Sequence, residues 1–306
     1  MLATVIAPFV VLLLFSIADN LRAEPSSDQP TTSIVLGGRG GLTPEPPVLV
    51  PAQEGTAPSI EVGARAGFAS DYIYRGVTLS DHKPAVGTAI EAALGPFYAG
   101  TTFTSVKLPN EHAVELTAMT GVRSKLWNVD WDFGWTYFAY PGGSPSGPRI
   151  DYWEVGGRAE TNVTGSVRMA AGFAYSPNVS NTGAWSKYAA FGLGVDLPSA
   201  VLPQDIGASV TAGVGYYWFG NQSAALGGFA LPAYFNWNTG VTLKRKIFSL
   251  DLRYYDTNLS KENCFVFTGD PNATPGGQPN PVTNPEGLTS RWCSATFVAK
   301  FGFELD

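Results

Sequence analysis

Charged side chains recur at alternate positions within otherwise apolar segments of this 306-residue chain. Carboxylates and cations occur in similar number. A charge that is buried without a partner is costly, so these residues either pair with one another or line water. They predict a narrow mixed-charge pore or, alternatively, an ion-pair network that fills a barrel; glycines in the same phase leave room for water and favour the pore. The candidates are Glu61, Arg65, Asp71, Arg75, Glu91, Glu115, Arg123, Asp130, Asp132, Glu154, Arg158, Glu160, Arg168, Lys244, Asp251, Arg253 and Lys300.

Residue types suited to catalysis are sparse, and the only two histidines are His82 and His112. A serine hydrolase needs a histidine near the serine in the folded protein. The run Ser80-Asp81-His82 contains suitable types, but residues adjacent in sequence do not make a triad. No phosphate loop, dinucleotide fingerprint or zinc-ligand spacing is present. We therefore expect no enzymatic activity, no cofactor and no metal site.

The segments that carry the charges have the period-two pattern of β-strands. Between Trp127 and Tyr140 every second residue from Trp127 is apolar, and the residues between them include Asp130 and Asp132. A strand points alternate side chains to opposite faces, so one face is apolar and the other polar. The pattern predicts about twelve strands, over residues 60–76, 85–94, 97–106, 112–123, 127–140, 150–160, 163–176, 185–197, 206–219, 233–243, 247–257 and 291–303.

The lengths of these segments and of their connections indicate a transmembrane barrel. Strands of soluble proteins usually have about five or six residues, whereas a membrane-crossing strand needs roughly 9 to 11. Long and short connections alternate, as in barrels with external loops and short periplasmic turns. We predict an all-β fold, an antiparallel up-and-down transmembrane β-barrel; a soluble sandwich is the alternative. Aromatic residues near strand ends would form girdles at the membrane interfaces: Tyr72, Tyr74, Trp127, Tyr137, Tyr175, Trp218, Phe219 and Trp237.

The composition agrees with a chain that faces lipid on one side of each strand. Charged residues make up 14% of the chain, against about 25% in an ordinary soluble domain. Aromatic residues make up 13%, which excludes overall disorder. A net charge of −6 argues against a nucleic-acid partner.

The N-terminal part of the chain has the composition of a targeting segment and a linker. Residues 1–23 predict a secretory signal peptide, cleaved after Ala23 or Ala18; an uncleaved anchor is the alternative. The Pro/Gly-rich residues 24–58 predict a periplasmic linker, and the barrel occupies residues 59–306. Export favours a disulfide between the two cysteines, Cys264 and Cys293, which would contribute on the order of 3 kcal/mol in the chain-entropy model.

The first predicted strand resembles the opening of the TorF-like family of outer-membrane porins of Gram-negative bacteria. That family begins its barrel with Ser-Asp-Tyr, an aromatic residue and Arg-Gly, followed by Pro-Ala. The matching residues are Ser70, Asp71, Tyr72, Tyr74, Arg75, Gly76, Pro84 and Ala85. Weaker similarity extends over roughly residues 60–303, including the cysteine pair. The resemblance implies an outer-membrane barrel with a porin role.

Two interpretations of this opening motif remain. Asp71 and Arg75 fall on the inward face of the first predicted strand, where they either contact a solute or, as we favour, form an ion-pair brace. We predict passive diffusion of small polar solutes across the bacterial outer membrane; the alternative is a filled barrel with a structural or surface-interaction role. The expected partners are outer-membrane lipid, small polar solutes and the barrel-assembly machinery.

Overall fold

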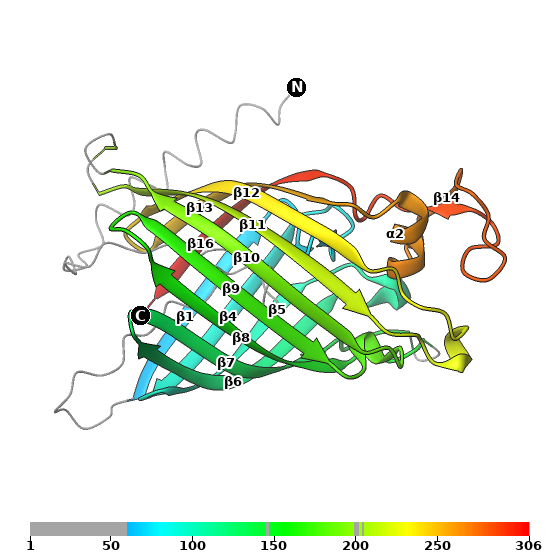
Figure 1. The fold of residues 1–306 in the computed structure, drawn as a ribbon, viewed down its shortest axis with the longest axis horizontal. Helices are drawn as coiled ribbons and strands as arrows, with labels where there is room; N and C mark the ends of the chain where they lie inside the picture. Colours follow the sequence, from blue (N-terminus) through cyan, green and yellow to red (C-terminus); the bar gives the residue numbers. More distant parts are fainter. Residues whose placement is uncertain (1–59, 145–146, 199–201, 204, 306) are drawn as a thin grey trace. The chain divides into compact units, whose positions relative to one another are not determined.

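A computed structural model describes residues 60–144, 147–198, 202–203 and 205–305. Twelve antiparallel strands form a closed barrel, in which each strand pairs with its neighbours along the chain and β1 pairs with β16 to close the wall (Figure 1). The predicted fold is therefore confirmed. The wall strands are β1 (Ile60–Ala69), β4 (Ala85–Leu94), β5 (Phe97–Ser105), β6 (Val114–Leu126), β7 (Val129–Ala139), β8 (Tyr152–Asn162), β9 (Val167–Ser176), β10 (Ser186–Asp196), β11 (Gly207–Phe219), β12 (Tyr234–Arg245), β13 (Phe248–Thr257) and β16 (Thr296–Leu305).

Side chains alternate between the outer and the inner face of the barrel wall. In β11, for example, Val210, Val214 and Trp218 point outward and are exposed, while Thr211 and Tyr217 point inward and are buried. The outer surface of the barrel is consequently apolar, with large exposed side chains on nearly every strand. Inside, polar and charged residues dominate, so the period-two pattern is that of a barrel with an apolar outside and a polar lumen.

Long and short connections alternate around the barrel and lie at opposite ends. The short turns are residues 95–96, 127–128, 163–166 and 246–247, and the connection between β10 and β11 at the same end, residues 197–206, is the exception in length. The long loops, which we call the outer loops, are residues 70–84, 106–113, 140–151, 177–185, 220–233 and 258–295. In Figure 1 the last outer loop, with α2 (Lys261–Thr268) and β14 (Thr274–Pro275), extends from one end of the barrel.

Three local features differ from the sequence-based expectation. The first strand ends at Ala69 rather than continuing to residue 76, because Arg75 and Gly76 have φ values of 51° and 86° and turn the chain back between β2 (Ile73–Tyr74) and β3 (Val77–Thr78). The turn expected at residues 124–126 lies at Trp127 and Asn128, which both have positive φ. Two adjacent residues with positive φ form the tight hairpin turn that matches strand twist.

The third difference is helix α2, which the sequence pattern did not predict. Its N-terminal cap is Ser260, whose hydroxyl accepts a hydrogen bond from the Asn263 amide, and it ends at Gly269 with φ 63°. Within the described residues, no helix has the length and apolar character needed to cross a membrane. The predicted signal peptide (1–23) and linker (24–58) lie outside the described residues.

Candidate functional site

The first outer loop, residues 70–84, folds into the barrel, and we call it the arm. Arg75 at its tip donates two hydrogen bonds to Glu154 of β8, at 3.0 Å to Oε1 and 2.7 Å to Oε2. Along the wall, β1 and β8 are separated by β4, β5, β6 and β7 on one side, and by β16 and β9–β13 on the other. The arm therefore reaches across the lumen and binds the opposite wall.

Aromatic rings surround the Arg75 guanidinium. Its carbon lies 4.7, 4.4 and 4.5 Å from the ring centres of Tyr74, Tyr188 and Tyr217. Cation–π contacts of this kind are strongest where the cation is removed from water, and Arg75 is only 3% exposed. Bidentate pairing with Glu154 fixes the orientation of the guanidinium plane. The tip of the arm is thus held by charge, hydrogen bonds and ring contacts together.

The base of the arm is held by two carboxylates. Asp71 accepts hydrogen bonds from Thr78 Oγ1 at 2.5 Å and Ser80 Oγ at 2.8 Å, which close the arm on itself. Glu115 of β6 accepts one hydrogen bond from Tyr72 and one from Tyr140, each at 2.8 Å. These contacts connect the arm to the wall near the outer end of β6, which is separated from its root in β1 by β4 and β5.

The surface part of the arm contacts the neighbouring outer loops. His82 Nδ1 lies 2.8 Å from Asp71 Oδ2, and its Nε2 lies 3.0 Å from the carbonyl oxygen of Arg291 in the last loop. Both partners are acceptors, so the doubly protonated ring satisfies both. The hydrogen bond to Asp71 accordingly raises the pKa of His82. Burial acts to raise the pKa of Asp81, but hydrogen bonds from Lys107, Lys83 and Trp292 outweigh it and lower that pKa.

Below the arm, ion pairs and hydrogen bonds join inward-facing side chains of the wall. Midway along the barrel, Arg253 contacts Asp251 at 2.8 Å and Asn238 at 2.7 Å. Nearer the short turns, Arg123 forms a bidentate pair with Glu91.

A second cluster near the short turns centres on Arg168. This side chain contacts Glu160 at 3.1 Å and Asp196 at 3.0 Å. The luminal wall thus carries paired charges of both signs, and the arginines of these pairs are buried: Arg168 is 2% exposed and Arg253 1%. Solvent therefore has little access to these two side chains.

The predicted luminal residues divide into buried and more accessible groups. Buried inside the barrel are Arg65, Asp71, Arg75, Glu91, Glu115, Arg123, Glu154, Arg168 and Arg253. Partly exposed are Asp130, Asp132, Arg158, Glu160, Lys244, Asp251 and Lys300, while Glu61 at the start of β1 is exposed. The expected placement of Asp71 and Arg75 on the wall is wrong, because both belong to the arm.

The predicted girdle residues also divide. Trp127 and Trp218 are exposed, at 86% and 41%, and Tyr175 at 37%; Tyr137 and Trp237 are partly exposed. Tyr72 and Tyr74 were expected to face lipid, but they lie inside the barrel, where the arm carries them to Glu115 and Glu154. Phe219 is buried as well and packs on Tyr217 and Tyr234.

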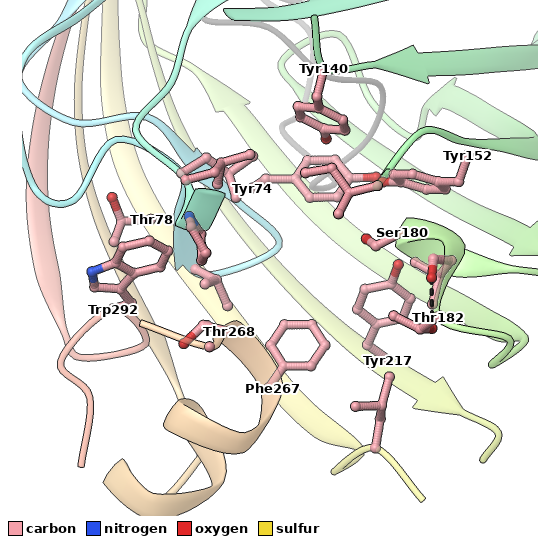
Figure 2. Close-up of a pocket in the computed structure, with 18 of the residues that line it drawn as sticks. Tyr74, Thr78, Tyr140, Tyr152, Ser180, Thr182, Tyr217, Phe267, Thr268 and Trp292 are labelled. Atoms are coloured by element: carbon pink, nitrogen blue, oxygen red, sulfur yellow. Dashed lines mark hydrogen bonds between the residues drawn. The ribbon is translucent and has the colours of Figure 1, made fainter. Parts of the chain in front are cut away.

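A cavity of about 330 Å³ lies between the arm and the other outer loops (Figure 2). Each of the six outer loops contributes to its lining, among them Val77 of the arm, Leu231 and Phe267. Sequence reasoning did not find this cavity. The available signal was a set of large apolar residues within loops that are otherwise polar and glycine-rich.

The predicted disulfide is confirmed. Cys264 of α2 is bonded to Cys293, just before β16, and both residues are buried. The bond attaches α2 to the root of the last strand and so places Phe267 and Gly269 over the cavity. Among the described residues, no group of three or more histidine, cysteine, aspartate or glutamate side chains is arranged to hold a metal ion.

Several solved structures of outer-membrane proteins are similar to the chain at low identity. A NanC porin has 9% identity and a TM-score of 0.44, with 80% of this chain and 100% of that chain covered. A KdgM porin has 8% identity and a TM-score of 0.42, covering 80% and 98%. LpxR from Salmonella typhimurium has 10% identity and a TM-score of 0.38, covering 79% and 99%. No curated protein matches the sequence.

The family comparison is more direct, because one family model matches residues 52–275, which is more than half of the chain. Its description gives no function, so the resemblance to TorF-like porins stays a prediction. The chain belongs to this family, Gcw_chp, described as a bacterial protein of unknown function.

Proposed function

We propose that this protein is a channel of the bacterial outer membrane and that the arm closes it in the conformation described here. Two features support a membrane location. The closed barrel pairs its strands without an edge, as lipid requires. Its outer surface is apolar, with Phe68, Ile90 and Phe133 about half exposed at 50%, 56% and 47%.

The observation that carries the channel proposal is the Arg75–Glu154 bridge across the lumen. A loop, not a wall strand, makes this closure. A loop can move out of the lumen without breaking any hydrogen-bonded strand pair of the wall. Barrels of eight strands are filled by wall side chains, while those of sixteen or more leave a channel. A twelve-strand barrel lies between them, and in this proposal the arm is the part that opens or closes the pathway.

The luminal wall indicates the class of solute. Paired charges of both signs line it, such as Arg123 with Glu91 and Arg168 with Asp196. A wall of this kind offers hydrogen bonds to polar solutes and no field of one sign. We therefore propose diffusion of small polar solutes with weak preference for ion charge once the arm has moved.

A second candidate function is a filled barrel that serves as a structural or surface-interaction protein. The burial of wall residues well below the arm, such as Arg253 at 1% exposure, favours it. If these side chains fill the lumen by themselves, then removing the arm opens nothing.

Planar-bilayer conductance separates the two functions. We would compare the wild type, an arm variant in which residues 71–83 are replaced by a short glycine-rich turn, and a control that shortens residues 277–286 of the last loop equally. The channel proposal expects rare openings for the wild type and control, and frequent discrete openings for the arm variant. No openings in any protein would support the filled barrel, and equal openings in all three would show that the arm is not the closure. Heat-modifiable gel mobility checks that each protein is folded.

A further inference from the structure

The cavity at the outer mouth of the barrel has the properties of a binding site. It is enclosed by the arm on one side and by the other outer loops around it. A volume of about 330 Å³ lies at the lower end of the range of about 300–1,000 Å³ that is usual for small-molecule sites. It suits a ligand of one or two rings.

Aromatic rings form a large part of the cavity wall. Tyr152, Tyr217, Tyr234 and Phe267 line it together with Tyr74 of the arm. Their packing is fixed by ring contacts: Tyr217 and Tyr234 lie 5.8 Å apart, and Tyr234 and Phe267 lie 5.4 Å apart, both edge to face. Figure 2 shows Tyr140, Tyr152 and Tyr217 converging on a common space from different strands and loops. Flat rings of this kind provide a large apolar contact surface at low cost in side-chain entropy.

No charged side chain lines the cavity among the residues that the structure describes. The charged groups that contact lining residues from behind already have partners: Arg75 pairs with Glu154, and Glu115 accepts hydrogen bonds from Tyr72 and Tyr140. An ionic ligand would lose its hydration here without gaining a counter-charge, which is costly. The lining therefore selects for an uncharged ligand.

Two tyrosine side chains at the cavity have hydroxyl groups for which the described residues offer no hydrogen-bond partner. Tyr152 is 6% exposed and Tyr234 1%, and both line the cavity. Nothing in the described part of the chain forms a hydrogen bond with either hydroxyl. By contrast, the Tyr74 and Tyr217 hydroxyls donate to Glu154. Since both residues line the cavity and neither hydroxyl is engaged, the Tyr152 and Tyr234 hydroxyls are available to a polar group of a ligand.

We propose that this cavity binds a small uncharged ring compound that carries hydroxyl groups. The rings would contact the faces of the ligand, and the Tyr152 and Tyr234 hydroxyls would bond its polar groups. A sugar ring and an aromatic alcohol share this chemistry. The inference holds whether or not the barrel conducts, since it concerns the mouth and not the lumen.

Ligand-observed NMR on the full-length protein in detergent micelles tests this proposal. The probes are methyl glucoside for a sugar ring, benzyl alcohol for an aromatic alcohol, and benzoate as the charged analogue of similar size. We expect saturable binding of at least one uncharged probe and none of benzoate. Saturable binding of benzoate with equal affinity, or binding of no probe, would overturn the proposal.

Matched variants locate the site. Tyr152→Phe and Tyr234→Phe keep the rings and remove only the hydroxyls, so we expect affinity to fall about three- to tenfold for each. Some probe will partition into detergent at the outer surface, and Tyr216→Phe is the control for that binding. Tyr216 lies on the outward face of β11, next to Tyr217, so this substitution should leave affinity unchanged. Equal affinity in all three variants would place the probe in the detergent belt and reject the site. Heat-modifiable mobility verifies that each variant is folded.

Discussion

Arg75 combines a bidentate ion pair with contacts to three aromatic rings. The ion-pair brace predicted for it is present, but its partner is Glu154 across the barrel and not a neighbour on the wall. The spacing of Asp71 and Arg75 indicated inward side chains correctly, because both are inside. It could not indicate that the backbone itself leaves the wall, since Tyr72 and Tyr74 continue the apolar phase of the strand, although Ser70 and Ile73 depart from the pattern.

Replacement of Arg75 by glutamine should destabilise the protein. The substitution leaves the buried Glu154 carboxylate without its cation, and breaking such a pair from one side costs about 3–5 kcal/mol. Glu154→Gln in the same chain should recover a large part of that loss, because the uncompensated charge is then gone. Urea unfolding followed by tryptophan fluorescence gives the free energies for a double-mutant cycle. Additive effects of the two substitutions would show that the pair does not couple the arm to β8.

His82 makes the contact between the arm and the last loop dependent on pH. The Asp71 carboxylate raises its pKa, so the folded state holds the proton more tightly than the unfolded chain does. The resulting stabilisation is complete below the ordinary value of about 6.5 and is lost as the pH rises through the raised pKa. NMR titration measures this directly, since His82 and His112 are the only histidines. Asp71→Asn should lower the pKa of His82, and an unchanged titration would remove Asp71 as the cause.

At the scale of elements, the arm depends on one glycine. Gly76 has φ 86°, and a Cβ there would lie 2.6 Å from Thr257 Cγ2. Gly95, in a short turn, also has positive φ, at 57°, but no atom lies within 4 Å of its Cβ position. Alanine would introduce backbone strain at both glycines, but only at Gly76 would it also meet β13. Comparing the two substitutions therefore separates the effect of strain from the effect of this close approach.

Gly76→Ala should release the arm, and Gly95→Ala should not. Strain at a left-handed residue costs about 1–3 kcal/mol, and the clash with Thr257 adds to it at Gly76 alone. Since proteolysis of a locally opened segment follows its opening free energy, trypsin should cleave after the buried Arg75 at least about tenfold faster in Gly76→Ala than in the wild type. Mass spectrometry of the fragments measures this cleavage. Equal rates in both glycine variants would mean that the turn does not hold the arm in place.

Most elements of the barrel could be predicted from the sequence, and the reason is physical. A wall strand between lipid and a polar lumen must alternate, so the twelve predicted segments correspond to the twelve strands. The mouth follows no such rule. Inward aromatics such as Phe138 and Tyr217 lie in the polar phase, and the pattern alone does not say that loops will cover them. Helix α2 is too short for a clear period and depends on its cap and disulfide.

At the scale of the whole molecule, placement in a membrane makes a prediction that a soluble barrel does not. Leu193, near the middle of β10, is 45% exposed, and Leu226, in an outer loop, is 44% exposed. In water the two positions would tolerate arginine equally well. In a bilayer, Leu193 faces acyl chains, and a cation there costs roughly 2–4 kcal/mol near the midplane.

We therefore expect Leu193→Arg to lower the free energy of unfolding from lipid vesicles by that amount, while Leu226→Arg leaves it nearly unchanged. The measurement is urea unfolding of vesicle-embedded protein, followed by the loss of heat-modifiable mobility. Both substitutions replace a leucine of nearly equal exposed fraction with arginine. A difference between their free energies of unfolding therefore reflects only the surroundings of the two positions. If both variants were as stable as the wild type, the apolar outer surface of the barrel would have to face something other than lipid.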